Sequence, residues 1–202
     1  MIYLFILLIL MTSCVKSDEV LTAEGGGISA EILISKSQDI IKIKDDKDTL
    51  ELDISELNPW KVQFANIDGG EVELALGVYK KSPYHDEMVK RLFLYNVDFK
   101  NKRLKPKVRI SRLSNPLVDF IMYDIDGDGF DEIVSIEKDI RGKFNLNGYD
   151  YVNSFVFEKN YMSKKLDTEP EFAYESGTIK VKGEEYKIYL EKGEIKWQRK
   201  NI

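Results

Sequence analysis

The chain of 202 residues contains one cysteine, one histidine and five prolines. A single cysteine excludes an internal disulfide, whatever the redox compartment. One histidine and one cysteine are also too few soft or imidazole ligands for a zinc site. Basic residues number 30 against 35 acidic ones, a net charge of −5. The chain therefore lacks the basic excess of a nucleic-acid-binding domain, and we expect no nucleic-acid partner.

Long apolar runs are also scarce, and the exception is the N-terminus. Ile2 to Met11 is apolar throughout and is followed by Thr12, Ser13 and Cys14. A membrane-spanning helix needs about 20 apolar residues. A shorter apolar run followed by small residues is typical of a signal peptide. An ordinary cleaved signal and a buried N-terminal strand remain alternatives.

Leu10 to Cys14 resembles a bacterial lipobox, and the resemblance implies lipidation of Cys14. We therefore expect residues 1–13 to be a lipoprotein signal peptide and residues 14–27 to be a flexible tether that includes three consecutive glycines. Two or more acyl chains hold a protein on a bilayer far longer than one. The expected location is extracytoplasmic, with the membrane reached through lipidated Cys14.

Residues 28–202 are expected to form a single β-rich domain. A hydrophobic content of 43% and an aromatic content of 11% are sufficient for a packed core. Alternating polar and apolar residues bounded by turn residues predict short strands. The predicted strands outside the centre of the chain are 28–35, 40–44, 49–54, 178–181, 184–190 and 194–199. The best candidate for a helix is 86–91, at most about two turns long.

An internal repeat organises the centre of the chain. Repeat units span about 58–110 and 115–170, and residues 28–57 and 171–202 flank them. Asn66 and Asp68 precede Asp124 and Asp126 by 58 positions. Further on, residues 93–95 and 99–104 align with residues 155–157 and 161–166 at a separation of 62. Repeated supersecondary units bury their open faces by stacking on one another.

The second unit contains an acidic loop in which Asp124, Asp126 and Asp128 alternate with other residues. Glycines at 127 and 129 allow the tight bend, because glycine takes positive φ without steric cost. The Phe130 carbonyl and the Glu132 carboxylate would complete an all-oxygen shell, which is the ligand set that calcium favours. An EF-hand is the alternative, but it needs a glutamate at position 12 and a helix on each side. Position 12 is Ser135, and both flanks are short and β-like.

The matching loop of the first unit contains Asn66, Asp68 and Glu73. It is one residue shorter than the loop of the second unit and lacks the third aspartate. We expect this degenerate copy of the acidic loop to be metal-free or to bind metal weakly.

The segment from Asp124 to Val134 resembles the acidic loop of FG-GAP or VCBS-type repeats, the units of integrin-like β-propellers. The resemblance implies an all-β fold of propeller-like, antiparallel four-stranded sheets, either incomplete or unusually small. It implies a structural Ca²⁺ held between two strands by Asp124, Asp126, Asp128, the Phe130 carbonyl and Glu132. Closed propellers usually have four to eight blades, so closure stays open.

No catalytic motif accompanies these features. We expect a lipid-anchored scaffold or binding module whose variable loops, 80–90 and 138–153, meet a protein or glycan partner. One alternative is a cell-envelope hydrolase that uses His85, Asp86 or Asp119. Another is a calcium-dependent, lectin-like sugar binder that uses Tyr79, Tyr84 or Trp60.

Overall fold

The computed structural model describes residues 18–82, 85–153, 156–173 and 177–200. Sixteen strands account for most of these residues, and the helical element among them is one 3₁₀ turn, η1 (Ser55–Leu57). The predicted all-β class with antiparallel sheets is confirmed. No helix in the described ranges is long and apolar enough to cross a membrane. The signal peptide and Cys14 lie outside these ranges, so processing and lipidation stay predictions.

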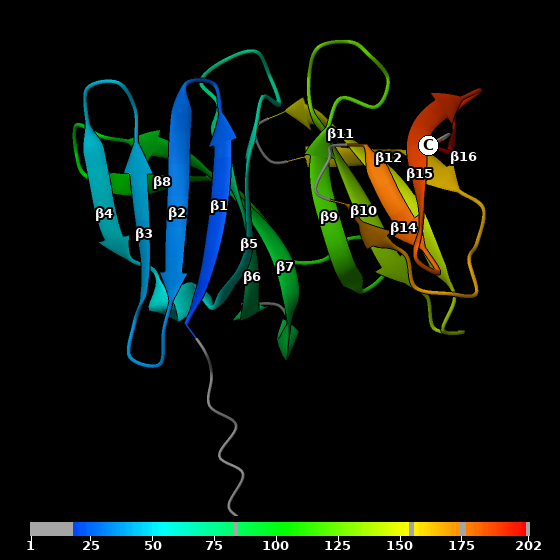
Figure 1. Ribbon diagram of the computed structural model, residues 1–202, viewed down its shortest axis with the longest axis horizontal. Coiled ribbons are helices and arrows are strands. Elements are labelled where there is room, and N and C mark those ends of the chain that lie inside the picture. Colours follow the sequence, from blue (N-terminus) through cyan, green and yellow to red (C-terminus); the bar gives the residue numbers. More distant parts are fainter. Residues whose placement is uncertain (1–17, 83–84, 154–155, 174–176, 201–202) are drawn as a thin grey trace, which may run out of the picture.

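The strands form four consecutive antiparallel meanders of four strands each (Figure 1). The first meander comprises β1 (Glu19–Gly25), β2 (Ile28–Ile34), β3 (Asp39–Lys44) and β4 (Thr49–Asp53). The second comprises β5 (Pro59–Ala65), β6 (Glu73–Ser82), β7 (His85–Asp98) and β8 (Arg103–Ile110). The third comprises β9 (Leu117–Tyr123), β10 (Glu132–Lys138), β11 (Phe144–Asn153) and β12 (Val156–Ser163). The fourth comprises β13 (Glu171–Phe172), β14 (Thr178–Val181), β15 (Glu184–Glu191) and β16 (Glu194–Arg199).

The third and fourth meanders are joined into one eight-stranded sheet. The junction is a short parallel pairing of β12 with β16, in which Met162 lies opposite Glu194 and Ser163 opposite Ile195. All other named strand pairs are antiparallel neighbours in sequence, so the chain adds one strand at a time. This order explains why local turn signals predicted the C-terminal strands closely.

Successive meanders pack face to face through three apolar cores. Ile32 and Ile43 of the first meander pack with Leu74 and Phe93 of the second. A second core lies between the second and third meanders, and a third lies between the third and fourth. Among the described residues no apolar cluster joins the first meander to the fourth. The four meanders therefore form a stack with two outer faces.

The first strands of the four meanders lie towards one another inside this stack. Contacts run from β1 to β5, from β5 to β9 and from β9 to β13. A cavity of about 510 Å³ is lined by residues of all four strands. The second and third meanders are covered on both faces, and their strands β6 and β10 are buried at six successive positions. A sheet covered on both faces buries successive residues of its strands, whereas the strands of an outer sheet alternate between buried and exposed residues.

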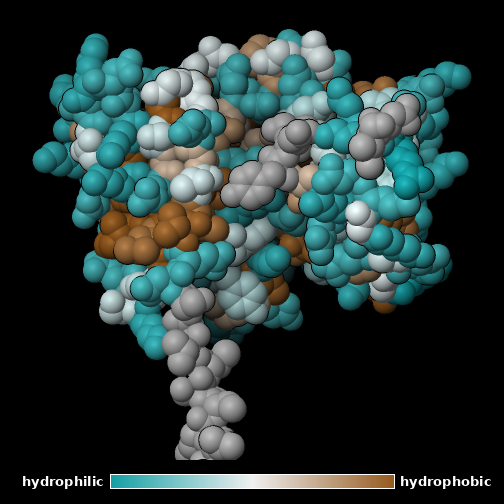
Figure 2. Space-filling view, viewed as in Figure 1, coloured by the Kyte–Doolittle hydropathy of each residue, from teal (hydrophilic) through white to brown (hydrophobic). Residues whose placement is uncertain are grey.

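The outer face of the first meander carries an apolar patch. Figure 2 shows this patch over the lower half of β2 and β3. Leu33 is 43% exposed and lies opposite Val20 on one side and Ile40 on the other. The neighbouring row on the same face, which includes Glu31 and Lys42, is charged.

The prediction of a flexible tether over residues 14–27 is wrong for its described part. Strand β1 begins at Glu19, and the glycine run forms the β1–β2 turn. Gly26 and Gly27 have φ values of +58° and +76°, as a two-residue primed hairpin turn requires. Glycines that suit a linker also suit such a turn, and the pairing of β1 with β2 decides between them.

Two further predictions about local structure are wrong. Residues 86–91 lie in β7, which pairs with β6, and form no helix. The predicted variable loops 80–90 and 138–153 are mostly strand, because β6 extends to Ser82 and β11 begins at Phe144. Their polar residues suggested loops, but strand pairing satisfies the backbone, and the buried Asn145 and Asn147 of β11 hydrogen-bond to each other.

The predicted alignment at a separation of 62 is also wrong. Leu74 pairs with Tyr95, and its counterpart Ile133 pairs with Tyr149, so the third strands match at 54 positions. Phe157 lies in the fourth strand, β12. Similar apolar patterns occur in neighbouring strands of one sheet, and only strand pairing shows which of them correspond.

Candidate metal centre

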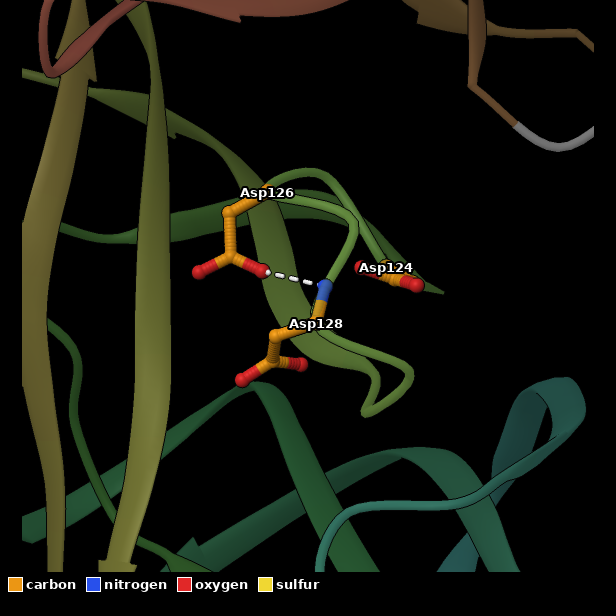
Figure 3. Close-up of side chains that lie close together, drawn as sticks. All are labelled: Asp124, Asp126 and Asp128. Carbon is orange, nitrogen blue, oxygen red and sulfur yellow. Dashed lines mark hydrogen bonds between the residues drawn. The ribbon is translucent and has the colours of Figure 1, made fainter.

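Three carboxylates converge in the turn between β9 and β10, here called the second loop (residues 124–132). Asp124, Asp126 and Asp128 each offer one carboxylate oxygen, and these atoms lie within 4.8 Å of one another. Figure 3 shows the three side chains gathered at the bend of the loop. A cation with oxygen ligands at 2.3 to 2.6 Å suits this spacing.

The loop's own backbone holds the carboxylates in place. Asp124 accepts hydrogen bonds from the Gly127 and Gly129 amides at 2.7 and 3.0 Å. Asp126 accepts from the Asp128 amide at 3.1 Å. Gly127 and Gly129 have φ values of +82° and +95°, where a side chain would be strained. The sequence argument for glycine at these positions is confirmed.

The predicted ligand Glu132 is not part of this cluster of three carboxylates. Glu132 opens β10 and is 4% exposed, and its Oε2 accepts the Ile125 amide at 2.9 Å. This side chain is therefore engaged with the backbone at the start of the loop. The Phe130 amide donates to Asp128 at 2.8 Å, and the Phe130 ring lies against Gly69 of the first unit.

The degenerate turn between β5 and β6, here called the first loop (residues 66–73), repeats these contacts. Asn66 accepts the Gly69 amide, as Asp124 accepts the Gly127 amide. Asp68 accepts the Gly70 amide, the counterpart of the bond between Asp126 and Asp128. The buried Glu73 accepts the Ile67 amide, as Glu132 accepts the Ile125 amide. The two loops therefore share one construction despite the missing residue.

The first loop differs in having a cation from the protein itself. Lys107 of β8 places Nζ 2.6 Å from the Asp68 carboxylate, and the same ammonium pairs with Glu73. The corresponding aspartates of the second loop form no ion pair in the described part of the chain. Sequence spacing gave no sign of Lys107, because it lies on a different strand from the loop.

The two loops are tied directly to each other. The Asn66 amide donates to Asp131 Oδ2 at 2.7 Å, and the Asp131 amide donates to the Asn66 carbonyl at 2.7 Å. The Asn66 side-chain amide also donates to the Gly129 carbonyl. Asp131 was absent from the predicted site, yet it connects the second meander to the third.

Several carboxyl groups of the two loops have pKa values shifted from their ordinary range. Burial, followed by the charges of Asp126 and Asp150, raises the pKa of Glu132 to about 7. Burial also raises the pKa of Asp131. In the first loop the hydrogen bond from Lys107 holds the pKa of Asp68 below its ordinary value. Burial raises the pKa of Glu73 in the first loop as well, so the loops differ in the lysine beside Asp68 and in the acidic neighbours of Glu132.

The residues suggested for catalysis or sugar binding do not form one site. Asp119 is paired with Lys61 at 2.7 Å, and Asp86 is paired with Lys81 at 2.7 Å. Trp60 packs edge-on against Phe120, with Lys90 over its ring. Tyr79 is 46% exposed and, together with His85, lines a cavity of about 530 Å³. Tyr84 lies outside the described residues.

Comparison with known proteins assigns no family. No family model matches the chain, and no curated protein matches it. Among solved structures the chain is similar to a Xanthomonas protein described as related to a type IV secretion system. The identity is 12% and the TM-score 0.37, over 92% of this chain and 96% of that one. This likeness is too distant to indicate a fold or a function.

Proposed function

We propose that this protein is a lipid-anchored, extracytoplasmic scaffold or binding module of propeller-like repeats, stabilised by one Ca²⁺ at the second loop. Asp124, Asp126 and Asp128 would hold the ion, with Glu132 and the Phe130 carbonyl as further donors. The bound ion supplies positive charge and fixes the turn between β9 and β10. Because Asp131 joins the two loops, fixing this turn would also restrain the first loop in the second meander.

The observation that carries this proposal is the contrast between the two loops. They have the same backbone-to-carboxylate hydrogen bonds, but the first loop is neutralised by Lys107. The second loop contains more carboxylates and has no such partner among the described residues. Asp124 is half-buried and Asp126 and Asp128 are exposed, so the cost in this loop is the mutual repulsion of carboxylates whose oxygens lie within 4.8 Å of one another, and a divalent cation relieves that repulsion.

A binding role is favoured over catalysis. Two of the carboxylates suggested for hydrolysis are already engaged by lysines. Two surfaces offer exposed apolar side chains to a protein partner: the cavity lined by Tyr79 and Met88, and the row around Leu33. Exposed apolar patches of this kind mark interaction sites. The first surface includes the hairpin at residues 80–90, where we place the protein or glycan partner; the hairpin at 138–153 is the second candidate.

Membrane attachment is proposed from the N-terminal sequence. Strand β1 begins at Glu19, so only a short segment separates Cys14 from the folded chain. Lipidation at Cys14 would hold the first meander close to the bilayer. Mass spectrometry of the purified protein would detect the acylated cysteine, and an unmodified mature chain would contradict the proposal.

Thermal unfolding with calcium and with EGTA tests the metal. We expect calcium to raise the melting temperature of the wild-type protein and to have no effect on Asp126→Ala. A ligand present at 100 times its Kd adds about 2.7 kcal/mol to the free energy of unfolding. The Asp98→Ala variant is a matched control, because Asp98 also accepts amides in a turn, at the β7–β8 hairpin. A wild-type protein indifferent to calcium would overturn the proposal.

A further inference from the structure

The two repeat units correspond residue by residue in their fourth strands. In the first unit the pairing of β7 with β8 shifts between Leu94 and Tyr95, which leaves Lys107 as the extra residue. In the second unit the pairing of β11 with β12 shifts between Gly148 and Tyr149. There the extra residue is Asn160. Both bulges lie at the same point of the meander, so Lys107 and Asn160 are equivalent.

The same register makes Asn96 of β7 equivalent to Asp150 of β11. Asn96 follows Tyr95 and Asp150 follows Tyr149, and these two tyrosines hold equivalent positions in the two units. Between the first unit and the second, therefore, a lysine is replaced by a neutral amide and a neutral amide by a carboxylate. Both exchanges make the surroundings of the second loop more negative.

Asp150 lies beside the second loop and is incompletely satisfied. Its Oδ2 accepts hydrogen bonds from the Asn160 amide and, at 3.3 Å, from the Tyr161 hydroxyl. The same hydroxyl lies 2.9 Å from Asp126 Oδ2 and so links the two carboxylates. The other carboxylate oxygen of Asp150, Oδ1, is buried and has no hydrogen-bond partner. A buried carboxylate oxygen left unpaired is costly, and a cation would satisfy it.

A cavity lies between Asp150 and the second loop, which it reaches at Asp128. It has a volume of about 320 Å³ and is lined by Asp128, Glu132, Asp150 and Asn160, among others. In the first unit, Lys107 contacts the counterparts of Asp126 and Glu132. The Lys107 ammonium therefore shows the position at which this repeat holds a positive charge. In the second unit the cavity beside Asp128 and Glu132 extends from the equivalent position to Asp150.

We propose that Asp150, on β11, contributes its carboxylate to the cation bound by the second loop. In the first unit the ammonium of Lys107 supplies the positive charge beside the equivalent loop. This inference rests on the proposed calcium site and adds a residue that the loop motif does not contain. Coordination would then join β11 to the turn between β9 and β10, so that the ion connects three strands of the third meander.

Calcium titration of the full-length protein by isothermal calorimetry tests the inference. We expect Asp150→Asn to weaken calcium binding by tenfold or more, because a carboxylate is lost. Glu158→Gln is the matched control: Glu158 lies opposite Asp150 on β12 and is exposed. Water and salt screen an exposed charge, so its removal should change the affinity less than twofold.

Melting temperatures without calcium separate this role from a structural one. We expect metal-free Asp150→Asn to melt at or above the wild-type temperature, because the substitution removes repulsion and keeps an acceptor for Asn160. A lower metal-free melting temperature with unchanged calcium affinity would overturn the inference, as would equal losses in Asp150→Asn and Glu158→Gln. Absence of calcium binding by the wild-type protein would instead overturn the proposed function.

Discussion

Lys61 and Asp119 hold equivalent positions in the second and third meanders and form an ion pair with each other. Nζ lies 2.7 Å from Oδ1, and both side chains are largely buried, at 22% and 23% exposure. The Lys61 ammonium also lies 5.4 Å from the ring centres of Phe120 and Phe172. One lysine therefore contacts the third and fourth meanders from the first strand of the second.

Loss of Asp119 should destabilise the protein. Asp119→Asn leaves the Lys61 charge without its partner, and burial already lowers the pKa of this lysine. We expect a loss of about 1–3 kcal/mol in the free energy of unfolding, the cost of leaving a buried polar group unsatisfied. Urea unfolding of Lys61→Met, Asp119→Asn and the double variant measures the coupling. Additive effects would show that the pair contributes no interaction energy.

Removal of Lys107 should be costlier. Lys107→Met leaves Glu73, which is fully buried, and Asp68 without a cation. Breaking a buried pair in this way typically costs about 3–5 kcal/mol. Because the ammonium is partly exposed, we expect about 3 kcal/mol in urea unfolding. Lys107→Arg keeps the charge and should lose much less; equal losses in the two variants would show that packing matters more than charge.

Two adjacent glycines should differ in their tolerance of alanine. A Cβ at Gly26 would lie 2.4 Å from Val72 Cγ2, whereas a Cβ at Gly27 would meet nothing within 4 Å. Both have positive φ, which costs a non-glycine residue about 1–2 kcal/mol. Gly27→Ala should show that cost alone in thermal unfolding, and Gly26→Ala should be clearly less stable. If residues 14–27 were a flexible tether, neither substitution would matter.

The metal-free protein should lose stability as the pH rises from about 5 to 7. The pKa of Glu132 is raised to about 7 in the folded state, against 4.5 as its ordinary value. The folded state therefore binds a proton that the unfolded state releases in this interval, and its advantage is lost as the pH passes the folded pKa. Urea unfolding in calcium-free buffer at several pH values measures the slope. Glu132→Gln should flatten it, and an unchanged slope would assign the dependence to other groups.

The sequence by itself determined much of the local structure and the candidate loop. Lys182–Gly183 and Lys192–Gly193 predicted turns, and all four residues have positive φ. Asp124, Asp126 and Asp128 predicted a convergent cluster, because alternate residues in a tight loop point the same way. These features depend on neighbours within a few positions, which a single sequence displays.

Tertiary structure alone decided the rest. Whether a polar segment such as residues 80–90 is a loop or a strand depends on pairing with another strand. Lys107, Asp131 and Asp150 join the loops from separate strands, so no spacing in the sequence reveals them. Strand register and β-bulges bring such residues together, and register depends on hydrogen bonds summed over whole sheets. The charge that distinguishes the two loops is therefore a property of the stacked meanders, because it comes from strands distant in the chain.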